Sequence, residues 1–158
     1  MSEPRTTELL EMSRSGSEFV ICDYDDDVDI SGPKQYAITT STKKVSLRIK
    51  IKYAALATIV VNTGLAIGSG GGAFVGTALT FTKRDQASSN APVATIKKDY
   101  VLGSSGQSAG TAIYTELNLP SRETEILLKL KASTVYGLVI TTIADNNYGN
   151  VIFEVDEI

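Results

Sequence analysis

The chain has 158 residues, of which 42% are hydrophobic and 21% are charged. This length fits one domain with its own core, and the composition is typical of a folded chain rather than a disordered one. The net charge of −3 provides no overall basic field, so we do not expect nucleic acid as a partner. Cys22 is the sole cysteine and histidine is absent, which excludes an internal disulfide and the commonest general base and metal ligand.

The first 18 residues differ in character from the rest of the chain. Residues 1–14 carry several charges without an apolar run, so we expect no signal peptide and synthesis in a cytoplasm. Leu9, Leu10 and Met12 form a small apolar patch within this polar stretch. We interpret residues 1–18 as an N-terminal arm that docks on a neighbouring protein through this patch, with a flexible tail as the alternative. Residues 19–158 then form the folded domain.

Period-two alternation of apolar and polar residues predicts the main strand. It runs without error from Val45 to Tyr53, and such alternation is typical of a strand with one buried face. Further segments rich in β-branched and aromatic residues predict eight more strands. These are Glu18–Cys22, Ala57–Val61, Thr77–Thr82, Ala94–Lys97, Ala112–Leu117, Ile126–Lys131, Val135–Ile143 and Val151–Val155. The sequence therefore predicts an all-β fold, a β-sandwich or jelly-roll-like single domain, with the Asp145–Asn150 stretch as a hairpin loop.

Residues 53–82 carry no charge and include six glycines between 64 and 76. Glycines spaced four apart allow membrane helices to pack closely, so membrane insertion through residues 53–82 is one alternative. Polar residues and glycines dilute the stretch below the roughly twenty apolar residues that a membrane helix needs. We favour two strands joined by a long, small-residue hairpin tip, with Phe74 placed against a neighbouring subunit.

Two short patterns look like catalytic or nucleotide-binding motifs. Gly106–Gly110 matches the Gly-x-Ser-x-Gly nucleophile elbow around Ser108, but the chain lacks the histidine that would activate the hydroxyl. Gly68–Ala73 matches a loose dinucleotide pattern, but a strand rather than a helix is expected to follow. We interpret both segments as loops and expect no enzyme activity and no cofactor.

Five aspartates lie between Asp23 and Asp29, and alternate carboxylates there are similar to the start of a calcium-binding loop. Ile30 and Tyr36 stand where that loop requires Gly and Glu, so the motif is excluded. We expect a solvated acidic loop, with irregular calcium binding or interface ion pairs as the alternative. Arg48, Lys50 and Lys52 on the exposed face of the main strand would meet this loop in a neighbouring copy.

Several segments resemble a known family. Ser15–Phe19 leads into a strand and an acidic turn, while Leu79–Asn90 and Ala94–Tyr100 are similar to a strand, a basic Asn/Ser-rich turn and a second strand. Glu123–Tyr136 is similar to a strand and polar turn before a Tyr-containing strand, and Ile140–Asn147 with Val151–Val155 looks like a closing hairpin. The chain thereby resembles the small virion structural proteins of tailed bacteriophages, of the head-decoration or minor-capsid kind.

The resemblance implies a non-enzymatic β-sandwich in the virion that binds the major capsid protein or other virion proteins and neighbouring copies of itself. A homo-oligomer is expected, with a trimer slightly favoured over a dimer. An adhesion or carbohydrate-binding module is an alternative, and it would need exposed aromatic rings such as Tyr100, Tyr114 and Tyr136 on one face. Membrane insertion remains the third possibility.

Overall fold

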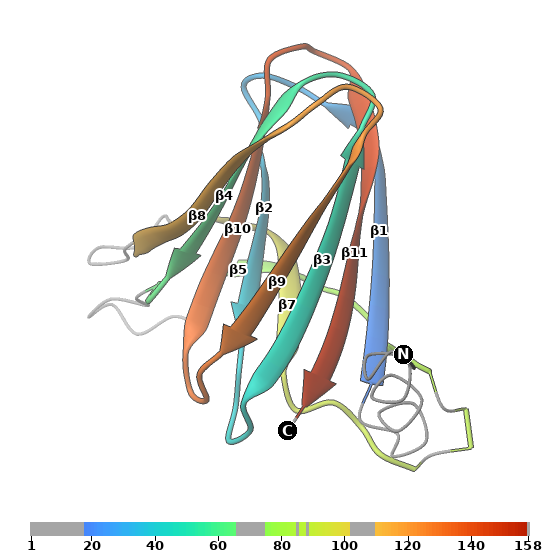
Figure 1. The fold of residues 1–158 in the computed structure, drawn as a ribbon, viewed down its shortest axis with the longest axis vertical. Coiled ribbons are helices and arrows are strands. Elements are labelled where there is room, and N and C mark those ends of the chain that lie inside the picture. The colour runs from blue at the N-terminus through green and yellow to red at the C-terminus, as the bar shows by residue number, and fades with distance from the viewer. Residues whose placement is uncertain (1–17, 66–74, 85, 88, 102–109, 158) are drawn as a thin grey trace, which may run out of the picture.

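The computed structural model describes residues 18–65, 75–84, 86–87, 89–101 and 110–157. In these residues the protein is all-β, and two antiparallel sheets pack face to face (Figure 1). The strands are β1 (Glu18–Val28), β2 (Lys34–Thr39), β3 (Val45–Tyr53), β4 (Ala57–Thr63), β5 (Val75–Ala78), β6 (Thr82–Lys83), β7 (Thr95–Val101), β8 (Thr111–Asn118), β9 (Glu123–Leu130), β10 (Val135–Thr142) and β11 (Asn147–Glu157).

The strand order identifies the type of sandwich. One sheet, here called the β3 sheet, has the order β6-β1-β11-β3-β9, and the other, the β10 sheet, has the order β5-β7-β2-β10-β4-β8. Without β5, β6 and β7, the sheets read β1-β11-β3-β9 and β2-β10-β4-β8, and every link except that from β4 to β8 changes sheet. Eight antiparallel strands arranged in this way form a jelly roll, which confirms the expected fold class.

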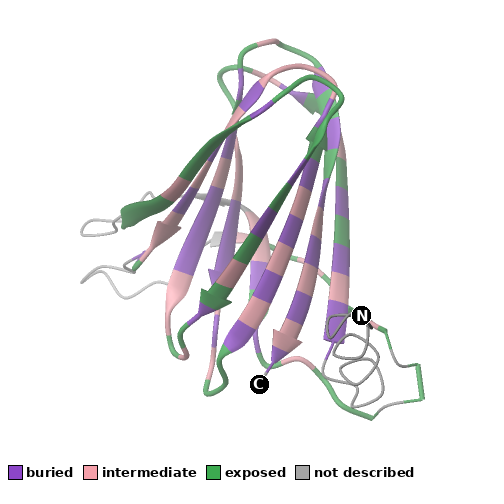
Figure 2. Ribbon diagram, viewed as in Figure 1, coloured by how far each residue is buried: buried purple, intermediate pink, exposed green. Residues whose placement is uncertain are grey.

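The core lies between the two sheets and follows from the alternation of apolar residues. Along β3 the inward residues Leu47, Ile49 and Ile51 are almost completely buried, while the residues between them face outward. Figure 2 shows the same alternation of buried and less buried positions along β3 and β11. Tyr36 of β2 meets Phe153 of β11 edge to face across the core, with ring centroids 5.2 Å apart. Burial of each such large side chain stabilises the fold by about 1.5–3 kcal/mol.

Strand β2 was not predicted from the sequence, and the structure shows why. Tyr36, Ala37 and Ile38 are buried in succession, so the strand lacks period-two alternation. Its inner face joins the core, whereas Ala37 on the other face packs with Leu65 and Val135 in a separate small cluster. A strand covered on both faces gives no alternating signal.

The predicted hairpins are wrong. The stretch around Asp145 joins β10 to β11, which lie in different sheets, so it is a crossover between sheets rather than a hairpin loop. Likewise β4 and β5 are separated in the β10 sheet by β10, β2 and β7, so the glycine-rich segment between them is not a hairpin tip. The strand predicted at Thr77–Thr82 is instead broken into β5 and β6, which belong to different sheets. Turn-forming residues mark where a strand ends but not where the next strand goes.

Residues 64–110 form an insertion between β4 and β8 of the jelly roll. Its strands β5 and β7 extend the β10 sheet beyond β2, and β6 pairs with β1. The Glu157 carboxylate accepts hydrogen bonds from the Val93 and Ala94 amides, and the ring of Phe81 packs against that of Phe19. The insertion therefore covers the side of the sandwich where β1 and β2 would otherwise be edge strands.

On the opposite side, β8 and β9 are the last strands of their sheets. Neither has a further neighbour among the described strands, and Figure 1 shows both along the open side of the sandwich. One side of the jelly roll is thus covered by its own insertion, and the other presents two strand edges that no described strand covers. Free edges are available for pairing with another chain.

Buried amides and hydroxyls hold the corners where the chain changes sheet. Asn118, at the end of β8, is fully buried; its side chain accepts a hydrogen bond from the Tyr53 amide and donates to the Ile51 carbonyl and Thr124 Oγ1. Asn147 similarly pairs with both backbone groups of Ala55. These side chains replace backbone partners that the ladders cannot supply at a corner.

We predict that Asn118→Ala lowers the free energy of unfolding by about 2–4 kcal/mol, because it leaves buried backbone groups of β3 without partners. Urea denaturation followed by fluorescence or circular dichroism measures this change. Asn150→Ala, at an exposed asparagine, is the matched control and should change stability by less than about 0.5 kcal/mol. Equal effects of the two substitutions would contradict the corner role of Asn118.

Candidate functional site

The interface residues expected from the sequence, Leu9, Leu10, Met12 and Phe74, lie outside the described residues, as does Ser108. Their role in assembly stays a prediction. Residue 18, which the arm was expected to include, is the first residue of β1.

The expected acidic loop is instead part of a strand. Asp23 lies inside β1 and is buried; it accepts a hydrogen bond from Tyr36 Oη at 2.7 Å and forms an ion pair with Lys98 Nζ at 3.1 Å. Asp25 forms an ion pair with Lys34. Partial burial raises the pKa of the Asp25 carboxyl, but the hydrogen bonds from Lys34 and from the Asp27 amide outweigh this and leave the pKa lowered. These carboxylates stabilise the edge of the sandwich.

Tyr36 and Asp23 join the two sheets. Burial raises the pKa of the Tyr36 phenol far above its ordinary value, and the neighbouring carboxylate of Asp23 adds to the shift. The phenol therefore stays protonated and donates its hydrogen bond across the sandwich. Among the described residues, no group of three or more acidic or cysteine side chains is arranged to hold a metal ion. The carboxylate of Asp23 instead bonds to Tyr36 and Lys98.

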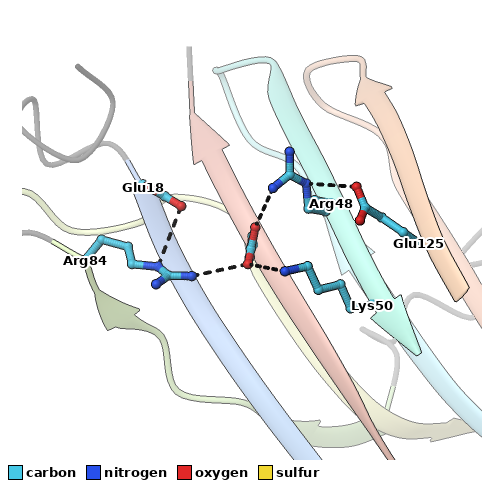
Figure 3. A network of polar contacts seen from close by, with 6 residues as sticks. Glu18, Arg48, Lys50, Arg84 and Glu125 are labelled. Atoms are coloured by element: carbon cyan, nitrogen blue, oxygen red, sulfur yellow. Dashed lines mark hydrogen bonds and ion pairs between the residues drawn. The ribbon is translucent and has the colours of Figure 1, made fainter. Parts of the chain in front are cut away.

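A network of charged side chains crosses the solvent face of the β3 sheet (Figure 3). At its centre, the Glu154 carboxylate of β11 lies 3.4 Å from Arg48 Nη1 and 3.3 Å from Lys50 Nζ. Arg84 of the insertion reaches the same carboxylate at 3.2 Å and lies 3.6 Å from the Glu18 carboxylate. The network therefore fastens the insertion to the jelly roll. Partly exposed ion pairs contribute little individually, but a shared carboxylate makes them act together.

This network provides internal partners for basic residues on the solvent face of β3, which the sequence had suggested for contact with a neighbouring copy. Arg48 also contacts Glu125 of β9 at 3.4 Å, so Arg48 and Lys50 both have acidic partners within the chain. Asp23 and Asp25 likewise have internal cationic partners. Four of the residues expected to pair between neighbouring copies thus form ion pairs inside one chain, and the expected contact between copies stays a prediction.

Exposed large apolar side chains concentrate on the open side of the sandwich. Leu127 of β9 is 58% exposed and Leu117 of β8 is 55% exposed, and Ile113 and Leu119 are also exposed. The sequence analysis did not identify these residues as a site. The sequence of β9 did indicate one of them. Leu127 lies between the exposed Glu125 and Lys129, at a position of the period-two pattern where a polar residue that faces solvent is expected. Leu127 lies on the solvent face of the β3 sheet, opposite Arg48, and Leu117 lies on the solvent face of the β10 sheet, opposite Thr58, so each edge strand carries its own exposed apolar residue. Exposed apolar residues on strand edges without a described neighbour are suited to contact with another protein.

A second feature lies at the end of the sandwich where β1 finishes and β11 begins. Tyr24 and Tyr148, 66% and 55% exposed, line a shallow pocket of about 200 Å³. Polar side chains of Lys52, Ser121 and Asn150 also line it. The neighbouring loops brace each other, because Asp145 accepts a hydrogen bond from the Ile30 amide and Asp29 accepts one from the Asn146 amide, both at 3.0 Å.

Gly149 lines the floor of this pocket and is required by close packing. A Cβ atom there would lie 2.3 Å from the Lys52 carbonyl oxygen and 2.6 Å from the Tyr53 ring. The absence of a side chain lets the Tyr53 ring lie against the neighbouring strand.

Two structural features concern the alternative functions, carbohydrate binding and membrane insertion. Tyr136 is 4% exposed and belongs to the core, so it cannot join Tyr100 and Tyr114 in an exposed aromatic platform. The described part of the chain contains no helix long and apolar enough to cross a membrane.

Glu18 provides a pH test of the network. Burial raises the pKa of its carboxyl, although the Arg84 guanidinium opposes this. A carboxyl whose folded-state pKa is raised stabilises the protein below its unfolded pKa, and this contribution is lost as pH rises through the folded pKa. We predict that Glu18→Gln gains stability relative to wild type as the pH rises above 4.5, the ordinary pKa of a glutamate. Thermal melts across this range measure the difference; a difference that stays constant or shifts in the opposite direction would contradict the prediction.

Comparisons with known proteins add no identification. No family model matches the chain, no curated protein matches it, and no solved structure matches it. The function is therefore argued from the described surface and from the sequence.

Proposed function

We propose that the protein is a non-enzymatic structural protein of a tailed-phage virion. It would attach to the head shell, through the major capsid protein or another virion protein, and to neighbouring copies of itself. The observation that carries this proposal is the open side of the sandwich, where two free strand edges lie beside exposed apolar residues. The resemblance of several sequence segments to head-decoration and minor-capsid proteins supports the virion as the location.

Physical arguments favour attachment over catalysis. Free edges and exposed apolar side chains invite aggregation unless a partner covers them, and an assembled particle supplies such a partner. The buried polar groups described above, Asp23, Tyr36 and Asn118, bond to other strands and hold the sandwich together. A jelly roll is found in viral capsid proteins but also in lectins and other proteins, so the fold alone does not decide between them.

We predict that the purified protein binds saturably to phage particles from which a decoration protein has been stripped. Leu117→Arg, on the open side, should weaken this binding by about tenfold or more, because it places a charge where the apolar contact forms. Co-sedimentation with the particles measures binding. Ile30→Arg, at a similarly exposed residue between β1 and β2, on the side that the insertion covers, is the matched control. Failure of the wild-type protein to bind any candidate particle would contradict the proposed function.

The pocket between Tyr24 and Tyr148 favours a second candidate function, the binding of a saccharide. Two exposed aromatic rings offer apolar faces for a sugar ring, and Asn150 and Ser121 provide donors and acceptors for its hydroxyl groups. This site differs from the platform of Tyr100, Tyr114 and Tyr136 that the carbohydrate-binding alternative would need. In this case the protein would act as an adhesion module.

We predict that Tyr148→Ala removes any binding found on a glycan array, since it deletes one of the two rings. Leu127→Ala, at a residue of equal exposure on the open side, should leave that binding unchanged. Absence of any wild-type signal across the array would exclude the saccharide function while leaving the structural proposal standing.

A further inference from the structure

The exposed residues along β9 are acidic toward the start of the strand and basic toward its end. Every second residue from 123 to 131 is exposed, and these residues are Glu123, Glu125, Leu127, Lys129 and Lys131, of which Lys131 directly follows the last residue of β9. Two acids thus precede the central leucine, and two lysines follow it at equal spacings. Residues that alternate along a strand lie on one face, so all five form a single row.

The two halves of this row have different surroundings within the chain. In the register of β3 with β9, Glu123 lies opposite Lys52 and Glu125 opposite Lys50, so basic residues face the acidic half. Lys129 lies opposite Ser46, which carries no charge. Within the described part of the chain, no ion pair is formed by Lys129 or Lys131. The lysine half of the row is therefore the half whose charge is least compensated inside one molecule.

The backbone of β9 is also available. The strand is the last of the β3 sheet, with β3 on one side and no described strand on the other. Its free edge carries alternate N–H and C=O groups that can continue the ladder into another strand. The side chain at the middle of the row, Leu127, is 58% exposed.

We propose that β9 pairs antiparallel with β9 of a second copy of this chain, about a two-fold axis that passes between the two Leu127 residues. In this register Glu125 lies opposite Lys129 of the second copy, and Glu123 lies opposite Lys131. Symmetry repeats each pair, so four ion pairs flank one leucine contact. The two β3 sheets then form one continuous ten-stranded sheet, and the protein is a closed dimer rather than the trimer favoured in the sequence analysis.

The charges select this arrangement over its alternatives. Parallel pairing in register would place acid against acid and lysine against lysine, and like charges directly opposite each other are destabilising. Antiparallel registers displaced from Leu127 leave at least one charged residue of the row without an opposite charge. Glu125 also contacts Arg48 in its own chain at 3.4 Å, so in the dimer it would bridge Arg48 and Lys129 of the second copy.

This inference rests on the self-association part of the proposed function and names its surface. The first test uses two charge reversals, Glu125→Lys and Lys129→Glu. Each variant alone would face like charges at both 125–129 pairs, so its dimer should dissociate at concentrations at least about tenfold higher than that of wild type. A mixture of the two variants restores opposite charges at both pairs and should form a heterodimer. Analytical ultracentrifugation measures all three samples, and recovery in the mixture shows that each variant is folded.

The second test is a cysteine crosslink in a Cys22→Ser background, because Cys22 is exposed and free. Leu127→Cys places the two thiols opposite each other on the axis, so mild oxidation should give a covalent dimer. Lys129→Cys is the matched control, because its thiol faces residue 125 of the second copy and lies four residues from its counterpart. It should not crosslink under the same conditions.

The outcomes separate this inference from the proposed function. A wild-type oligomer that neither charge reversal weakens, or that crosslinks equally at residues 127 and 129, would overturn β9 pairing and leave self-association in place. A wild-type monomer at high concentration would overturn the pairing, and binding to stripped particles would then decide the virion role separately. Loss of the dimer in each variant with recovery in the mixture would establish the pairing.

Discussion

The face-to-face packing of the two apolar sheet faces is the constraint on which the rest of the structure depends. β3 and β11 contribute an uninterrupted row of buried residues to one face, and β10 and β4 provide the other, including the fully buried Leu138, Ile140 and Ile59. A chain that must keep every strand's apolar face in one core has to cross repeatedly from sheet to sheet. Each crossover interrupts the backbone ladder, and this is why buried side chains such as Asn118 and Asn147 are needed at the corners.

The insertion covers one side of the sandwich only, and the candidate interaction surface lies on the other side, along β8 and β9. Strands β5, β6 and β7 cover the edges of β1 and β2. Arg84 fastens the insertion through the ion network, and the Glu157 carboxylate fastens it by accepting hydrogen bonds from the Val93 and Ala94 amides. The β8 and β9 edges have no such cover among the described strands. Because the insertion protects one side, the opposite side is the one whose described strand edges are available for association with other molecules. The charge row on β9 then restricts which neighbour and which register are compatible with that edge.

Much of the fold could be predicted from the sequence, because burial of one face leaves a period-two pattern. β3 was predicted with its observed ends, Val45 and Tyr53, and most other strands were found within a few residues. β2 was missed because both of its faces are covered. The candidate surface was missed because a leucine in a predicted strand, such as Leu127, is normally expected to be buried. Its exposure is evident only once the neighbouring residues are known to face solvent. The pocket between Tyr24 and Tyr148 was missed because its residues are far apart in the chain.

By itself, the sequence determined the all-β class, the absence of histidine chemistry and the positions of most strands, since these follow from residue types and local periodicity. Only the tertiary structure decided which strands are neighbours. It assigned β10 and β11 to different sheets, turned the expected acidic loop into a strand that bonds to Tyr36 and Lys98, and used Arg48 and Lys50 inside the chain. The physical reason is that strand order and ion pairing depend on contacts between residues that are distant in sequence. Which of the possible contacts form is decided only when all strands pack into one core.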